Sequence, residues 1–548
     1  MQDVIAGNKG ARLRPEAVAK WQWVWGALVF GLSLAVLWFR RDPTAFSYYD
    51  EGVIAYGAQR ILQGDVPHRD FWVIYPPGQL LAIAALFKVL GSSLAVERAW
   101  DIALRAGIAL LAYLVTARLA PRRYALLAGA MSLLWLQGIR FYGYPLIPAL
   151  LLTLVSVWFF IGFLHRQSII RNLFMAGLFT GLLVAFRHDI AFYVCIAEGL
   201  AIFGAHVLDR RAARSNASPP STLLAVVSSL CAGVAVGVLP LVVYLVAEVP
   251  ASVLLDQWIV FPATVYPAVR ALPYPAFFSS SPESIVPFYF HFLVLAIAAL
   301  FLVGAPQSMR PEKQAHVRKV VIFLALLIGL MFLKSLVRPH LAHLIHVLVL
   351  SFVLGAVVWS ALPAGWLFHA IRALLAIAFC AMLFDPIYTA QAESIWQERL
   401  RANAAAFARS ANFSRAGGLL VLPDQAAAID YVRAHVPPGE RIFVGNGRHD
   451  VVLLNDVLFY FLSERDSATR YHELVPGVAT TARVQQTIID DLQSKHVRVV
   501  VLFLGADLVR EPNDSARSSH VTLLDDYLKQ QYRLAGQAGN YRWLEKRD

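Results

Sequence analysis

The chain has 548 residues, of which 58% are hydrophobic and only 15% are charged, and its mean hydropathy is +0.57. A soluble fold cannot hide so much apolar surface behind so few charges, so most of the chain must lie in lipid. The formal net charge of +12 does not indicate a nucleic-acid-binding protein, because the basic residues stand in short clusters between apolar stretches and not on one face interleaved with aromatic residues.

Apolar stretches long enough to cross a hydrocarbon layer of about 30 Å recur along the chain. Examples are Trp21–Phe39, Leu146–Leu164, Leu223–Ala247 and Leu344–Leu362. We expect about eleven such spans in all. The first is expected to be a retained helix, because no small-residue cleavage site precedes Arg40 and Arg41.

Clusters of Lys and Arg fall at every second turn between the spans. They comprise Lys9, Arg12, Arg14 and Lys20; Arg118, Arg122 and Arg123; Arg166 and Arg171; Arg210, Arg211 and Arg214; and Arg310, Lys313, Arg318 and Lys319. By the positive-inside rule these turns are cytoplasmic, which puts the N-terminus inside. With an odd number of spans, the C-terminus is then expected outside.

The first outer segment covers residues 41–91 and is more than a connector. Between Gly52 and Gly64 the apolar residues share one helical face and the polar residues another, which predicts a short helix along the membrane surface. The apolar run Gln79–Leu90 is too short to span, so we expect a half-buried helix there.

Two further outer segments follow. The segment Pro250–Pro287 is rich in Pro, Tyr and Phe, which indicates a structured interfacial loop. After about Asp385 the apolar spans stop and helix and strand patterns alternate, so we divide the chain into a membrane domain, residues 1–386, and a soluble outer α/β domain, residues 387–548. The alternation comprises predicted helices over Asp424–His435, Thr480–Ser494 and Val521–Tyr532 and predicted strands over Arg441–Val444 and Val497–Leu504.

Asp50 and Glu51 are adjacent carboxylates at the start of the predicted surface helix. One interpretation is structural: Asp50 caps the helix N-terminus and Glu51 complements the helix dipole. The other is chemical: a carboxylate here is a general base for an acceptor hydroxyl. Both roles can coexist in one residue.

The first outer segment carries three motifs: Tyr49-Asp50-Glu51-Gly52, the run Gly64–Phe71, and Tyr75-Pro76-Pro77-Gly78. Together they resemble the first outer loop of GT-C glycosyltransferases, most closely the bacterial relatives of protein O-mannosyltransferases and of the aminoarabinose transferase that modifies lipid A. The chain differs from the protein O-mannosyltransferases in having Pro-Pro-Gly in place of a His-Pro element and in lacking a large luminal insert, so the resemblance does not imply a protein acceptor.

Two more ionisable clusters lie at the expected outer ends of spans: Arg187-His188-Asp189, and Lys334 with Arg338, His340 and His343. Charges so close to hydrocarbon are costly unless they face a wet cavity or pair, so these clusters are site candidates. The alternative is interfacial anchoring by snorkelling side chains. A metal site at the two histidines lacks a third ligand with suitable spacing. Arg338 suits a phosphate, because guanidinium binds phosphate oxygens in a bidentate fork.

The resemblance implies an inverting glycosyltransferase that moves a sugar from a polyprenyl-phosphate donor to a glycan or lipid acceptor at the outer face of a bacterial inner membrane, with a periplasmic C-terminal domain and no metal or other cofactor. Its expected catalytic residues are Asp50 and Glu51, and its expected donor-binding or substrate-binding residues are His68, Arg69, Asp70, Tyr75, Arg187, His188, Asp189, Lys334, Arg338, His340 and His343. The alternative is a transporter or flippase for a lipid-linked sugar, a class in which inverted repeats are common, and none is visible here.

The alternating basic clusters predict the topology directly. Reporter fusions after residues 215 and 420 should report the cytoplasmic and the outer side respectively, because the first position follows a basic cluster and the second follows the last expected span. If both fusions report the same side, the number of spans between them is wrong.

Overall fold

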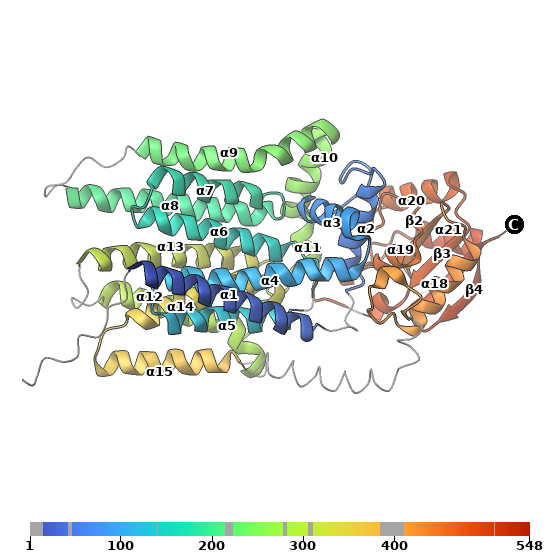
Figure 1. Cartoon of the computed structure of the whole chain (residues 1–548). Helices are drawn as coiled ribbons and strands as arrows, with labels where there is room; N and C mark the ends of the chain where they lie inside the picture. Colours follow the sequence, from blue (N-terminus) through green and yellow to red (C-terminus); the bar gives the residue numbers. More distant parts are fainter. Residues whose placement is uncertain are drawn as a thin grey trace, which may run out of the picture.

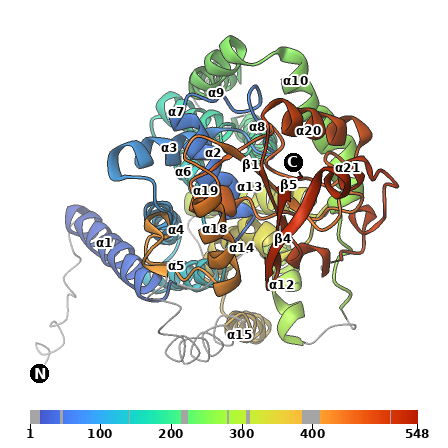
Figure 2. The same cartoon turned by 90° about the vertical axis from the view of Figure 1, so that its right-hand side faces the viewer.

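The computed structural model of the chain has an elongated bundle of apolar helices with an α/β domain at one end (Figure 1). Seen from that end, the C-terminal domain covers part of the bundle (Figure 2). The structure describes residues 15–41, 47–139, 141–213, 223–277, 282–304, 311–383, 410–508 and 510–547. The expected domain border at residues 386 and 387 lies outside the described residues, as do Lys9, Arg12, Arg14, Arg214 and Arg310.

Eight helices among the described residues are long and apolar enough to cross a membrane. They are α1 (Pro15–Phe39), α4 (Leu94–Ala117), α6 (Leu146–Leu164), α8 (His188–Ala213), α9 (Leu223–Glu248), α12 (Pro282–Gly304), α13 (Pro311–Ser335) and α14 (Leu341–Ala361). The shorter helices α5 (Arg122–Gly138), α7 (Ile169–Leu183) and α15 (Trp366–Ala381) run alongside them (Figure 1). The expectation of a polytopic helical membrane protein is confirmed, and the expected number of spans is reached when these three are counted.

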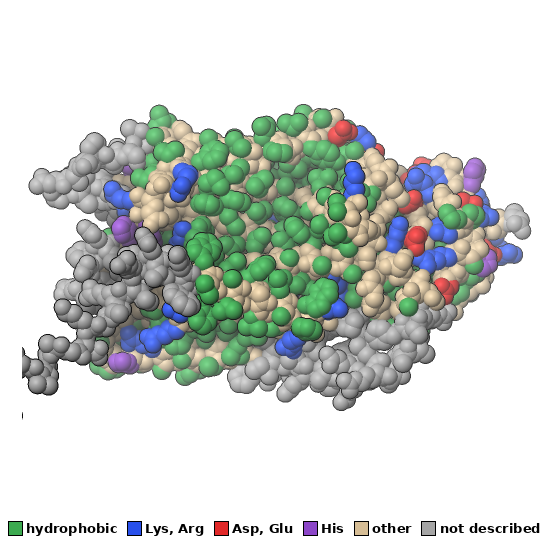
Figure 3. All heavy atoms as spheres, viewed as in Figure 1, with side chains coloured by type: hydrophobic (Ala, Val, Ile, Leu, Met, Phe, Trp, Pro, Cys, Tyr) green, Lys and Arg blue, Asp and Glu red, His purple; other side chains and the backbone are tan. Residues whose placement is uncertain are grey.

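Hydrophobic side chains cover the flank of the bundle that faces the viewer in Figure 3, and charged side chains gather toward its ends and on the C-terminal domain. Such a belt suits a lipid environment, where helices satisfy their own backbone hydrogen bonds. Inside the bundle, α14 is buried on all sides from Leu344 to Val358. Its first turn carries His343 and so places that residue at one end of the buried stretch.

Helices α2 (Asp50–Leu62) and α3 (Gly78–Leu90) lie between the bundle and the C-terminal domain (Figure 1). The short helix expected at Gln79–Leu90 is confirmed. The helix expected between Gly52 and Gly64 is present as α2, and its polar side is partly covered. Arg60 is only 5% exposed, pairs with Asp65 at 2.7 Å and contacts the ring of His472 at 3.2 Å, so this polar face meets the C-terminal domain instead of water.

The segment after α9 is helical where a structured loop was expected. It forms α10 (Ala251–Leu255), η1 (Asp256–Val265) and α11 (Tyr266–Arg270). Helix η1 is a π-helix that contains Pro262. Pi-helical turns are rare in proteins, but those that occur are often at functional sites. Helix η1 is therefore a candidate wall of a functional site.

The C-terminal domain contains a five-stranded sheet of order β2-β1-β3-β5-β4, in which β1 runs parallel to β2 and β3, and β5 runs antiparallel to β3 and β4. Figure 2 shows α18 on one side of the sheet and α20 and α21 on the other. The elements are η2 (Ser414–Ala416), α18 (Pro423–His435), β1 (Arg441–Asn446), α19 (Leu458–Ser463), β2 (Asp466–Ser467), α20 (Ala482–Ser494), β3 (Val499–Phe503), η3 (Gly505–Leu508), η4 (Asp514–Ala516), α21 (Leu523–Gln531), β4 (Tyr532–Ala538) and β5 (Tyr541–Lys546). The expected α/β domain is thus confirmed, with the hairpin β4–β5 as an unforeseen addition.

The first outer segment and the C-terminal domain share one hydrophobic core. It joins Val53 and Ile54 of α2 and Phe71 to Phe459 and Phe461 of α19. Backbone hydrogen bonds cross the same border, because the Leu458 N–H donates to the Tyr48 carbonyl at 3.0 Å and the Trp72 N–H donates to the Arg470 carbonyl at 3.0 Å. The domain is therefore docked on the first outer segment through packing and through shared backbone bonding.

Gly52 allows the closest approach in this contact. A Cβ atom added there would lie 2.3 Å from the backbone nitrogen of Leu458. Gly52→Ala should therefore destabilise the protein by about 1–3 kcal/mol, the usual cost of overpacking, and lower its thermal midpoint in mild detergent.

Gly31→Ala is the matched control, because it is also a glycine within a helix but a Cβ atom there would meet no atom within 4 Å. Alanine favours helices over glycine, so the control should be neutral or stabilising. A Gly52→Ala variant as stable as its control would contradict the tight docking of α2 on α19.

Candidate functional site

A cavity of about 280 Å³ lies at the end of the bundle that faces the C-terminal domain. It is bounded by the loop before α3, the α7–α8 connection, η1 and the α13–α14 connection. It brings together seven of the residues expected to bind the donor: Tyr75, Arg187, His188, Asp189, Lys334, Arg338 and His343. Residues from five distant stretches of sequence thus line one space.

Cationic nitrogen atoms without partners face this cavity. Arg187 holds Asp189 in a fork, with Nε to Oδ1 at 2.9 Å and Nη2 to Oδ2 at 2.7 Å, and its Nη1 is buried without a hydrogen bond. Lys334 has no hydrogen-bond or ion-pair partner among the described residues, and it lies close enough to interact electrostatically with Arg187 and Asp189. A buried donor without a partner is costly, so an anion such as phosphate is the natural ligand here.

Arg338 reaches the cavity wall but is already engaged. Its Nη1 and Nη2 donate to the two carboxylate oxygens of Glu511 at 2.7 and 2.6 Å, and Nη1 also donates to the Arg270 carbonyl at 2.9 Å. The amide of Asn513 holds the same carboxylate at 3.0 Å. Arg338 therefore joins the membrane part to the C-terminal domain, and an incoming anion would have to compete with Glu511.

Asp50 is the first residue of α2 and is half-buried. Its carboxylate accepts a hydrogen bond from the Ser47 hydroxyl at 3.1 Å. Tyr49 occupies the N-cap position without a side-chain cap bond, so the interpretation of Asp50 as a helix cap is wrong. Burial raises the pKa of the Asp50 carboxyl above its usual value, while the Ser47 hydroxyl and the guanidinium groups of Arg270 and Arg338 partly lower it.

Glu51 lies in a buried ion pair. Arg98 donates to its two carboxylate oxygens at 2.7 and 3.1 Å, and the Ser47 N–H donates to it at 3.0 Å. The Arg98 guanidinium in turn lies 4.2 Å from the ring centroid of Tyr142. These bonds to both oxygens hold the start of α2 in place beside Asp50.

Four of the residues expected to bind the donor or substrate, His68, Arg69, Asp70 and His340, lie outside the cavity lining. His68 is buried, its Nδ1 donates to Gln257 Oε1 at 2.7 Å, its Nε2 accepts from Trp258 Nε1 at 3.2 Å, and burial lowers its pKa to about 4. Arg69 pairs at the surface with Asp70 at 2.9 Å and with Glu248 at 2.5 Å. The Nδ1 of His340 accepts from the Ala342 N–H at 3.3 Å and caps α14. In the described parts of the chain, no three His, Cys, Asp or Glu side chains group closely enough to hold a metal ion.

The structure adds residues that the sequence analysis did not single out. Glu473 of the C-terminal domain is fully buried, and its carboxyl accepts a hydrogen bond from the Tyr49 hydroxyl at 2.5 Å. Burial raises the pKa of Glu473 to about 8, partly offset by the bond from Tyr49. Arg270 is 9% exposed and acts electrostatically on Asp50, Glu473 and Glu511.

A sequence signal existed for some of these residues. Arg270 is the only Lys or Arg between Pro250 and Pro287, and Tyr266, which lines the cavity, belongs to the same aromatic-rich segment. Tyr144 precedes a span and also lines the cavity. No local pattern marks Glu473, because its role depends on the docking of two segments far apart in the chain.

Solved structures resemble this chain at low sequence identity. ArnT from Cupriavidus metallidurans bound to undecaprenyl phosphate has 12% identity and a TM-score of 0.51, with 95% of this chain and 97% of that chain covered. The archaeal oligosaccharyltransferase AglB from Archaeoglobus fulgidus, in complex with an inhibitory peptide and a dolichol-phosphate, has 12% identity and a TM-score of 0.53, with 87% and 69% covered. All are GT-C membrane glycosyltransferases. The chain has the GT-C fold.

The arabinofuranosyltransferase AftD from Mycobacteria extends the comparison. It has 13% identity and a TM-score of 0.50, and the match covers 96% of this chain but 40% of AftD. No protein-family model matches the sequence, and no curated protein sequence matches it. The expected GT-C fold is therefore confirmed at the level of structure, whereas the roles of individual residues stay predictions.

The raised pKa of Glu473 predicts how the stability of the protein depends on pH. Its pKa is about 8 when folded and near 4.5 ordinarily, so the folded state holds a proton that the unfolded state loses between those values. The free energy of unfolding should therefore fall by about 1.4 kcal/mol per pH unit as the pH rises through this window. Glu473→Gln, which is neutral at every pH, should remove that slope in denaturant titrations.

The control is Glu440→Gln, because Glu440 is exposed and pairs only with Arg498 at the surface. Its pH profile should follow the parent. Parallel profiles for the parent and Glu473→Gln would mean that Glu473 is ionised in the folded protein.

Proposed function

We propose that this chain is an inverting glycosyltransferase that transfers a sugar from a polyprenyl-phosphate donor to a glycan or lipid acceptor at the outer face of the membrane. The observation that carries the proposal is the cavity in which Arg187 Nη1 and Lys334 Nζ have no partner among the described residues, near a carboxylate with a raised pKa, in a chain with the GT-C fold. It is in keeping with ArnT bound to undecaprenyl phosphate and AglB in complex with a dolichol-phosphate.

In this proposal the donor phosphate lies between Arg187 and Lys334. Leu333 and Val337 line the same cavity and are 54% and 36% exposed. The isoprenoid tail can therefore leave the cavity sideways into lipid while the phosphate stays at the cationic wall. Tyr75 and Tyr144, whose rings meet edge to face at 5.9 Å, line the same cavity and offer hydroxyls to the sugar.

Transfer breaks the bond between the anomeric carbon and the phosphate oxygen while an acceptor oxygen bonds to that carbon from the other face. The negative charge that develops on the departing phosphate is stabilised by Arg187 and Lys334, which is the larger electrostatic contribution. Asp50 takes the acceptor proton, and its raised pKa makes it a stronger base than an exposed aspartate. Asp50 does not line the cavity itself, but its charge acts on both Tyr75 and Tyr144.

The proposal includes an orientation. We place the N-terminus in the cytoplasm and the C-terminal domain in the periplasm of a bacterial inner membrane, as the positive-inside rule favours. The cavity, α2 and η1 then lie on the periplasmic side, where a lipid-linked sugar and an envelope acceptor can meet.

Two variants should separate chemistry from donor binding. Asp50→Asn keeps the size and the acceptor for the Ser47 hydroxyl but has almost no basicity, so kcat should fall by about 10²–10⁴ with unchanged affinity for undecaprenyl phosphate. Lys334→Gln should instead weaken that affinity, because the lysine meets a charge present before the reaction. Transfer is measured with a panel of undecaprenyl-phosphate sugars and bacterial envelope glycolipids, and affinity with undecaprenyl phosphate alone.

The controls are Asp514→Asn and Lys88→Gln, which make the same changes at exposed positions away from the cavity. Full activity in Asp50→Asn would refute the proton-transfer role and leave transfer to an acceptor that is already ionised. Unchanged undecaprenyl phosphate affinity in Lys334→Gln would refute the position assigned to the phosphate.

A further inference from the structure

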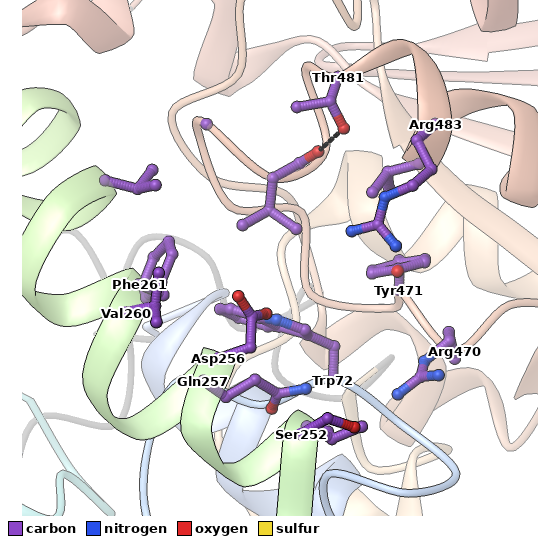
Figure 4. Close-up of a pocket in the computed structure, with 15 residues that line it drawn as sticks. Trp72, Ser252, Asp256, Gln257, Val260, Phe261, Arg470, Tyr471, Thr481 and Arg483 are labelled. Carbon is purple, nitrogen blue, oxygen red and sulfur yellow. Dashed lines mark hydrogen bonds between the residues drawn. The ribbon is translucent and has the colours of Figure 1, made fainter.

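A second cavity of about 320 Å³ lies between η1 and the C-terminal domain (Figure 4), and the transfer chemistry above does not use it. One wall comes from η1 and includes Gln257 and Phe261. The other wall comes from the C-terminal domain and includes Arg470, Tyr471 and Arg483. Phe261 also lines the donor cavity, so η1 is the partition between the two spaces.

The second cavity carries a net positive charge. Its charged lining residues are Arg470, Arg483 and Asp256. The Nη2 of Arg470 donates to the His68 carbonyl at 3.0 Å, which fixes the side chain, and its Nη1 has no partner among the described residues. Arg483 is exposed, and its guanidinium likewise has no hydrogen-bond or ion-pair partner within the described ranges. Two guanidinium groups in one cavity favour a carboxylate or phosphate ligand.

Groups suited to a sugar surround these charges. Trp72 and Tyr471 line the cavity as aromatic surfaces, on which the apolar C–H face of a sugar ring can pack (Figure 4). Gln257 uses its amide oxygen to accept from His68, so its amide nitrogen is left to donate to a hydroxyl. Asp256 is exposed at the cavity and can accept from hydroxyls. A few convergent polar groups beside aromatic rings are typical of small-molecule sites.

We propose that this cavity binds an acidic saccharide, with its carboxylate or phosphate between Arg470 and Arg483. This inference rests on the proposed function, because it takes the saccharide to be part of the acceptor. The anchored saccharide then carries a hydroxyl that reaches the donor cavity past Phe261. The π-helical turns of η1, interrupted by Pro262, are the element that positions Phe261 between the anchored group and the donor.

The test measures binding to the purified full chain in detergent at low salt, without donor. The probes are trigalacturonic acid for the carboxylate, glucose 6-phosphate for the phosphate, and maltotriose as the neutral saccharide. At least one acidic probe should bind about tenfold or more tightly than maltotriose, as charge-assisted hydrogen bonds to two guanidinium groups require. Which of the two binds better identifies the anionic group.

Arg483→Gln should reduce the affinity for the acidic probe to near that of maltotriose. Arg533→Gln is the matched control. It removes the same positive charge, but from β4, and Arg533 lines neither cavity. Equal affinities of the parent for acidic and neutral probes would overturn the proposal, as would an Arg483→Gln variant that binds the acidic probe like the parent.

Measuring the binding of undecaprenyl phosphate tests this inference separately from the proposed function. Arg483→Gln should bind undecaprenyl phosphate like the parent, whereas Lys334→Gln should not. If both variants lose it equally, the second cavity belongs to the donor and the acceptor assignment is overturned. If the parent does not bind undecaprenyl phosphate at all, the proposed function fails, and the acidic probes still decide whether the second cavity binds acidic saccharides.

Discussion

The packing of the first outer segment against the C-terminal domain is the contact on which the rest of the structure depends. Without it, α2 would expose Val53, Ile54 and Tyr56, which are at most 1% exposed in the structure. The Tyr56 hydroxyl also accepts a hydrogen bond from the Ser467 N–H at 2.6 Å. A backbone donor of the C-terminal domain thus finds its acceptor in the membrane part. Because Asp50 begins α2, the docking of the domain also fixes the position of the proposed base.

Polar side-chain contacts also cross this border. Arg338 with Glu511 and Tyr49 with Glu473 each join the membrane part to the C-terminal domain. Removing one member of a buried pair leaves its partner uncompensated, which costs far more than the pair contributes. Because Arg338 is engaged by Glu511, Arg187 Nη1 and Lys334 are the cationic positions of the proposed donor cavity that have no partner among the described residues.

Features with a local physical cause could be predicted from the sequence. Span lengths, the short helix α3 and the alternation from α18 to β3 all follow from apolar runs and periodicity, and the charge cost near lipid singled out Arg187 and Lys334. The burial of α2 could not be predicted, because its polar face is indistinguishable in sequence from one that meets water. Glu473 and Glu511 were equally invisible, since each acquires its role from a residue more than a hundred positions away.

The shared core also sets an order of events during synthesis. Helix α2 is made early, but α18 and α19, which belong to the same core, follow about 360 residues later or more. At a translation rate of about 5–20 residues per second, the apolar side of α2 stays uncovered for roughly 20–70 s while the intervening helices enter the membrane. The nascent chain therefore needs the lipid interface or a chaperone to shield apolar residues of α2 that the finished protein buries.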